Sequence, residues 1–182
     1  SVRRSRNYSN RANTPLWLLL AFVVIVAGSF LLLRHPKSAI GDHITVYYTK
    51  TDGKTVVPWT VSMRPAQKGE SPADRLHYAV LYGATQAVAG PDSSISAIRF
   101  PVGTHVRAVN VAGNVATIDL SADVKNQVGG SLAESGEFKA LVWTLTALPG
   151  IEAVSVKVDG VKVDTLPGGH LELDQPLRRS DW

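Results

Sequence analysis

Apolar and polar residues alternate along several stretches of the chain after about residue 43, and this alternation predicts strands. Residues 44–49 and 55–63 are β-branched and aromatic runs joined by an Asp-Gly turn. We expect them to form a hairpin, with Pro58 at an edge or a bulge. A second hairpin is predicted from the alternating runs at 106–111 and 115–120, which are joined by a short loop that contains glycine.

Apolar residues spaced three and four positions apart predict two helices. The first begins at the sequence Ser-Pro-Ala-Asp (71–74), which supplies an N-cap, a proline at the first helical position and an acid in the first turn. It ends before Gly90. The second helix is expected to begin with Ser131 as N-cap and Glu134 as its capping-box partner, and to end at Leu148.

The pattern changes from the helix period to the strand period after a Pro-Gly stop. Val154, Val156 and Val158 alternate with other residues, and an Asp-Gly turn then leads to a short strand at 161–163. The predicted order is therefore β-β-α-β-β-α-β-β. This order predicts an α+β domain in which two helices pack on one face of a mixed or antiparallel sheet.

Residues 16–33 form an uncharged apolar run of 18 residues. As a helix this run would be about 27 Å long, near the lower limit for crossing a bilayer. Four arginines precede the run and two cations follow it, which favours an N-terminus in the cytoplasm. We therefore predict a cytoplasmic basic tail (1–15), an uncleaved transmembrane signal-anchor helix (16–33) and a tether (34–43) that leads to an extracytoplasmic domain.

Charge is distributed unevenly along the chain. Six of the 19 Lys and Arg residues and none of the 15 Asp and Glu residues lie in residues 1–40, so the remainder is slightly acidic. The basic N-terminus suits a membrane surface with anionic lipids, and nothing indicates binding to nucleic acid. The absence of cysteine excludes disulfides and thiolate metal sites. We expect no cofactor.

The order and spacing of these elements resemble the GerMN domain, an extracytoplasmic module of sporulation and germination proteins. The matching stretches are ITVYY at 44–48, AGP at 89–91, FPVGTHV at 100–106, GNVATIDLS at 113–121, LVWTLTALPG at 141–150 and VDG at 158–160. The resemblance covers residues 44–166 and leaves 167–182 as an irregular tail. It implies a compact domain related to the ring-building modules of envelope machines, with a non-enzymatic role in assembly. Whether the protein forms homo-oligomers is left open by the resemblance.

No set of residues in the sequence predicts catalysis. The histidines are not spaced as metal ligands, and His77 and His105 are expected to be solvated or turn residues. Asp119 and Asp123 are explained more simply as turn or capping residues than as paired acids. The Gly-Gly-Ser sequence at 129–131 could receive an anion at a helix start, but it lacks the lysine of a phosphate loop. We therefore predict that the protein is not an enzyme.

Aromatic residues of the first hairpin are the candidates for binding a partner. Tyr47, Tyr48 and Trp59 lie on its two strands, and alternation exposes at least one of the tyrosines. Exposed aromatic side chains on an edge can mark a surface for a protein or a glycan, although cross-strand packing is the simpler explanation. Trp143, on the more polar side of the second helix, could fill a gap against the sheet or bind a partner.

The sequence thus predicts a single-pass protein of the bacterial cytoplasmic membrane whose outer domain assembles with other envelope proteins. The alternative is a cell-wall-binding accessory or a regulator of a peptidoglycan hydrolase, because aromatic residues outside the membrane would also suit that role. A third hypothesis is a wall-modifying enzyme with an unrecognised site. In that case changes at His77, His105 or Asp119 should abolish activity without unfolding the protein.

Overall fold

The computed structural model describes residues 40–126 and 128–182. The predicted basic tail (1–15), the apolar span (16–33) and residues 34–39 of the predicted tether (34–43) lie outside these ranges. Within the described residues, no helix is long and apolar enough to cross a membrane. The structure therefore describes the predicted outer domain together with its C-terminal segment.

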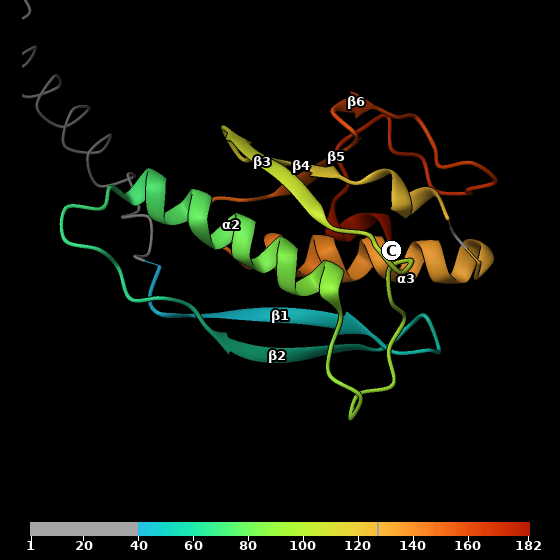
Figure 1. Ribbon diagram of the computed structural model, residues 1–182, viewed down its shortest axis with the longest axis horizontal. Coiled ribbons are helices and arrows are strands. Elements are labelled where there is room, and N and C mark those ends of the chain that lie inside the picture. The colour runs from blue at the N-terminus through green and yellow to red at the C-terminus, as the bar shows by residue number, and fades with distance from the viewer. Residues whose placement is uncertain (1–39, 127) are drawn as a thin grey trace, which may run out of the picture. The chain divides into compact units, whose positions relative to one another are not determined.

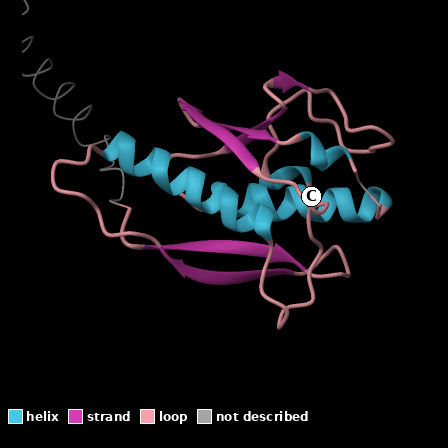
Figure 2. Cartoon of the chain, in the orientation of Figure 1, coloured by secondary structure: helices cyan, strands magenta, loops and turns pink. Residues whose placement is uncertain are grey.

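The described domain has an α+β architecture in which two helices lie between two separate sheets (Figures 1 and 2). Strands β1 (His43–Thr49) and β2 (Val56–Ser62) form an antiparallel pair. The second sheet has the order β3-β4-β5-β6 and consists of β3 (Val106–Ala112), β4 (Val115–Leu120), β5 (Ala153–Val158) and β6 (Val161–Lys162). The helices are α2 (Pro72–Ala89) and α3 (Gly130–Leu145).

The single sheet predicted from the sequence is replaced by two sheets because β1 packs on α3. Tyr47 N–H, on the edge of β1 away from β2, donates a hydrogen bond to Thr144 Oγ1 of α3 at 2.9 Å. The side chains of Ile44 and Val46 are buried, and β1 contacts both helices. An apolar strand face can be covered by helices as well as by a sheet, and here helices cover it.

The core contains residues of β1, of both helices and of the second sheet. β4 and β5 run parallel, so the chain must cross over between them, and α3 lies within this crossover. Phe138, Leu141 and Leu145 of α3 are fully buried. Ile118 and Leu120 of β4 are fully buried as well and belong to the same core cluster. The crossover helix therefore holds the second sheet in place.

The start of α3 differs from the sequence prediction. The capping box of Ser131 and Glu134 does not form: the helix begins at Gly130, and its N-cap Gly129 makes no side-chain hydrogen bond. Glu134 is buried instead, and its carboxylate accepts the N–H of His170 at 2.7 Å. A carboxylate inside a domain requires a hydrogen-bond donor, and the long-range donor replaces the local one.

The two helix starts provide a matched pair of substitutions. In α2 the hydroxyl of Ser71 accepts the N–H of Asp74 at 3.1 Å, so the predicted N-cap is confirmed. We expect Ser71→Ala to lower the free energy of unfolding by about 1 kcal/mol, and Ser131→Ala to change it by less than about 0.5 kcal/mol. Urea denaturation followed by tryptophan fluorescence measures both values. Equal losses at the two positions would contradict this difference between the helix starts.

The segment after residue 166 has little regular structure but belongs to the domain. Leu173 and Leu177 are buried in the core. Leu177 exchanges two backbone hydrogen bonds with Val154 of β5, at 2.9 and 2.8 Å, and so covers part of the edge of that strand. A short turn of 3-10 helix, Arg179–Asp181, then brings Trp182 against α3. The domain therefore extends to the end of the described chain.

Candidate functional site

The structure buries one of the three aromatic residues that the sequence proposed as a partner surface. Tyr48 is only 4% exposed, and burial raises the pKa of its hydroxyl group. It shares the inner face of β1 with Ile44 and Val46, because every second residue of a strand points to the same side. Tyr48 is therefore a core residue, and the proposal that it belongs to a partner surface is corrected.

Tyr47 and Trp59 lie on opposite faces of the β1–β2 hairpin. Tyr47 is paired with Pro58, and Trp59 is paired with Val46. Residues directly opposite each other in an antiparallel pair share a face, whereas neighbours along a strand alternate. Trp59 is 45% exposed and remains at the surface. The two residues nevertheless do not form one site.

Tyr47 belongs instead to a cluster of aromatic and cationic side chains from distant parts of the chain. The guanidinium carbon of Arg179 lies 5.6 Å from the ring centroids of both Tyr47 and Trp143. Trp182 packs edge-to-face on Trp143, with 5.7 Å between the ring centroids. Lys139 Nζ lies 5.5 Å from the Trp143 ring centroid. These five residues are named the Trp143 cluster.

Hydrogen bonds to α3 hold the Trp143 cluster in place. Ser135, Lys139 and Trp143 follow one another at intervals of four residues and lie along one side of the helix. Trp182 Nε1–H donates to Ser135 Oγ at 2.8 Å. Arg179 donates to the carbonyl oxygen of Trp143 at 2.8 Å, near the C-terminal end of α3, where a cation is favourable. The cluster is thus ordered before any partner arrives.

The chemistry of the Trp143 cluster suits binding of a macromolecule. Tyr47, Trp143 and Trp182 are each partly exposed, and Arg179 is exposed. Trp, Tyr and Arg are the residue types that dominate the energetics of protein interfaces. The sequence pointed to Tyr47 and Trp143 separately but gave no sign of Arg179 or Trp182, because their positions depend on the path of the C-terminal segment.

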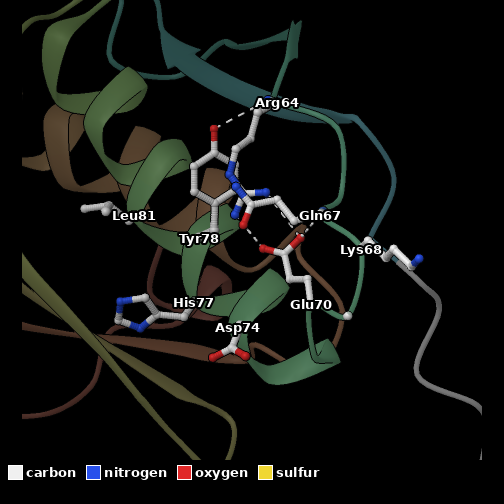
Figure 3. Close-up of a pocket in the computed structure, with 9 residues that line it drawn as sticks. Arg64, Gln67, Lys68, Glu70, Asp74, His77, Tyr78 and Leu81 are labelled. Carbon is white, nitrogen blue, oxygen red and sulfur yellow. Dashed lines mark hydrogen bonds and ion pairs between the residues drawn. The ribbon is translucent and has the colours of Figure 1, made fainter.

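A cavity of about 440 Å³ lies between the loop after β2 and the outer face of α2 (Figure 3). Arg64 lies over the ring of Tyr78, 4.1 Å from its centroid, and forms an ion pair with Glu70. Hydrogen bonding to Arg64 lowers the pKa of the Glu70 carboxyl group, and Glu70 raises the pKa of Arg64. These two charges neutralise each other, and the contact of Arg64 with Tyr78 joins the loop to α2.

The residues weighed as catalytic candidates are not brought together. His77 is exposed on α2, and His105 Nδ1 lies 2.9 Å from a backbone carbonyl oxygen. Asp119 accepts a backbone N–H from the turn after β5 at 2.7 Å, and Asp123 accepts the hydroxyl of Ser121 at 3.0 Å. In the part of the chain that the structure describes, no group of three or more His, Cys, Asp or Glu side chains could hold a metal ion.

The hairpin, the two helices and the mixed sheet define an α+β domain of the GerMN type. Residues 45–164 match the Germane family, which is described as sporulation and spore germination. Because the match covers well over half of the chain, the protein belongs to this family. The resemblance stated from the sequence is confirmed. No curated protein matches the chain.

Three solved structures have a similar fold. The tandem GerMN domains of the sporulation protein GerM from Bacillus subtilis superpose with a TM-score of 0.58 at 20% identity, over 76% of this chain and 46% of that chain. The first GerMN domain of GerM has a TM-score of 0.50 and 26% identity, over 76% of this chain and 98% of that domain. A candidate lipoprotein from Clostridium perfringens has a TM-score of 0.52 and 21% identity, over 81% and 94% of the two chains. The protein spans about half of the tandem structure.

Proposed function

We propose that this protein is a membrane-anchored, extracytoplasmic assembly module of the bacterial cell envelope that binds another envelope protein and catalyses no reaction. The Trp143 cluster is the observation that carries this proposal. Family membership supports this role, and the solved structures of similar fold include a sporulation protein and a candidate lipoprotein. The predicted span at 16–33 would supply the anchor.

The Trp143 cluster has the two properties that a protein-binding surface requires. It presents aromatic area together with the cations Lys139 and Arg179, which can pair with carboxylates of a partner. It is also pre-organised: Arg179 is held by Trp143, and Lys139 Nζ donates to the carbonyl oxygen of Lys54 at 3.2 Å. Side chains that are already ordered lose less conformational entropy when a partner binds.

A cell-wall-binding accessory or a regulator of a peptidoglycan hydrolase is the alternative function. Trp59 is the observation that favours it, because this indole ring is exposed on β2, away from the Trp143 cluster. A large amphipathic ring at the surface can contact a glycan as well as a protein. The two functions therefore use different faces of the β1–β2 hairpin and can be separated by experiment.

Photo-crosslinking in the native host tests the proposal with the full chain. We would place a photoreactive amino acid at Ser180, an exposed position between Arg179 and Trp182, and identify the adducts by mass spectrometry. The matched control carries the same amino acid at Lys125, an exposed residue of a different turn. We expect Ser180 to capture a defined envelope protein that Lys125 does not capture, and we expect Lys139→Glu to reduce that adduct.

Other outcomes would decide against the proposal. Adducts that consist mainly of wall polymer, and that Trp59→Ala removes, would favour the cell-wall alternative. Equal adducts from Ser180 and Lys125, unchanged by Lys139→Glu, would show that the Trp143 cluster does not bind a partner.

A further inference from the structure

Several edges of the described strands are protected against pairing with other chains. The outer edge of β1 is occupied by α3 through the hydrogen bond from Tyr47 to Thr144. The outer edge of β5 is covered by Leu177 and by the two-residue strand β6. An uncovered edge presents free N–H and C=O groups to which another strand can add.

The edge of β2 is blunted by its own residues. Because the N–H of Tyr47 points away from β2, Tyr47 and its partner Pro58 form a pair without hydrogen bonds, and the nitrogen of Pro58 faces the open edge. Proline has no N–H to donate to an added strand. The carbonyl oxygen of Ser62 already accepts the hydroxyl of Tyr82 at 2.9 Å.

The directions of the hydrogen bonds in β4 show which backbone N–H and C=O groups of β3 are already hydrogen-bonded within the sheet. The carbonyl oxygens of Asn114 and Leu120 accept N–H groups from the β5 side, whereas the N–H of Ser121 donates to the carbonyl oxygen of His105 on the β3 side. Successive residues of a strand direct their backbone groups to opposite edges. Even-numbered residues of β4 therefore bond to β5, and odd-numbered residues bond to β3.

This alternation in β4 identifies the backbone groups of β3 that have no hydrogen-bond partner within the sheet. The odd-numbered β4 residues are paired with Ala108, Asn110 and Ala112, whose N–H and C=O groups are therefore used within the sheet. The N–H and C=O groups of Val109 and Val111 point to the open edge. No hydrogen bond links these groups to any other residue in the described ranges.

β3 has few of the usual devices that protect an edge strand, because its pairing with β4 is irregular only between Val106 and Ala108. Its sequence, VRAVNVA, contains no proline, lysine or acid, and the exposed residues Asn110, Ala108 and Ala112 are small and uncharged. Its one charged residue, Arg107, is paired with Asp119 and Asp159 at 3.3 Å each. Beside the edge lies a groove of about 640 Å³ between β3 and the start of α2. The apolar residues that line this groove are Pro72, Ala73, Leu76 and Val111.

We propose that β3 pairs antiparallel with β3 of a second copy of this chain, about a two-fold axis that passes through Asn110. In this register Val109 of each copy exchanges backbone hydrogen bonds with Val111 of the other copy, so all the free groups of both valines are used. The second sheet then continues from one copy into the next. This inference concerns a surface separate from the Trp143 cluster, so it can fail or hold independently of the proposed function.

The register is self-complementary, which favours a second copy as the occupant of this edge. Asn110 faces Asn110 of the second copy, and an amide side chain offers both a donor and an acceptor. Ala108 faces Ala112, and Arg107 faces Gly113, so the pairing places no like charges opposite each other. Val109 and Val111 are on the inner face of the strand and would contribute apolar area beside the groove.

Engineered cysteines test the two-fold axis directly, because the chain has no cysteine of its own. Residues opposite each other in a non-hydrogen-bonded antiparallel pair have Cα atoms about 4.5 Å apart, within the range of a disulfide. We expect the full chain with Asn110→Cys, purified in detergent, to form a disulfide-linked dimer at least about tenfold faster than the control Thr60→Cys on β2. Equal rates for the two variants would overturn the proposal.

Charge substitutions at Asn110 test the same axis without a covalent bond. We expect Asn110→Lys to raise the dimer dissociation constant at least about tenfold, measured by analytical ultracentrifugation of the full chain in detergent, whereas Thr60→Lys leaves it unchanged. Mixing Asn110→Lys with Asn110→Glu should restore the dimer, because opposite charges then face each other. A wild-type chain that stays monomeric at every concentration, or a mixture that stays monomeric, would overturn the proposal.

Discussion

Replacing Arg75 by Met is expected to lower the free energy of unfolding by about 3 kcal/mol. The Arg75 side chain is only 6% exposed although it carries a charge. Its guanidinium group donates to the carbonyl oxygens of Ile40, Gly41 and Arg64 and to the carboxylate of Asp42. Methionine fills a similar volume but offers no donor, so these acceptors would lose their partners inside the domain.

Two further substitutions give this prediction its controls. Arg64→Met removes a neighbouring arginine that is 34% exposed, and we expect a loss of about 1 kcal/mol or less. Arg75→Lys keeps the charge but cannot reach several acceptors with one planar group, so most of the loss should remain. Urea denaturation of the three variants measures these values. If Arg75→Met cost no more than Arg64→Met, the buried hydrogen bonds would not be the cause.

Arg75 joins parts of the domain that are distant in the sequence. Its acceptors lie on residues 40–42, where the described chain enters β1, and on Arg64, where the chain leaves β2. Arg75 itself belongs to α2. One side chain therefore connects the entrance of the domain with the helix that lies next to β3. Loss of this connection should loosen the hairpin relative to α2 before it affects the second sheet.

Local signals in the sequence predicted local structure well. The cap at Ser71, the two hairpins and the change from helix to strand through a Pro-Gly stop depend on neighbouring residues. All three are present, although α3 ends at Leu145 rather than at Leu148. The division into two sheets was not predicted. Alternation shows which face of β1 is buried but not whether a sheet or a helix covers it, and the bond from Tyr47 to Thr144 is long-range.

The candidate site was harder to predict than the fold. Alternation required that Tyr47 and Tyr48 point to opposite sides, but it did not decide which of them is buried. Trp143 gained its neighbours from the C-terminal segment, whose irregular course has no periodic signal. The role of Glu134 was also missed for this reason. Its spacing from Ser131 predicted a capping box, but its carboxylate accepts the backbone N–H of His170, which is distant in the sequence.

Phe138→Ala is expected to have the largest effect on stability, lowering the free energy of unfolding by about 4 kcal/mol. Phe138 is fully buried and packs edge-to-face on Phe100, with 5.6 Å between the ring centroids. The substitution removes the ring, leaves a cavity in the core beside Phe100, and eliminates the aromatic pair. Most small domains are stable by only about 5–15 kcal/mol, so this loss would bring the protein close to unfolding.

Matched controls separate the cavity from a general effect of changing α3. Leu132→Ala alters a side chain of the same helix that is 54% exposed, and we expect a change within about 0.5 kcal/mol. Phe138→Leu keeps most of the volume and should cost about 1.5 kcal/mol or less. Phe100 lies in the segment that leads to β3, so loss of its partner should also weaken the proposed pairing of β3 between copies. A Phe138→Ala protein as stable as Leu132→Ala would contradict the central place of Phe138 in the core.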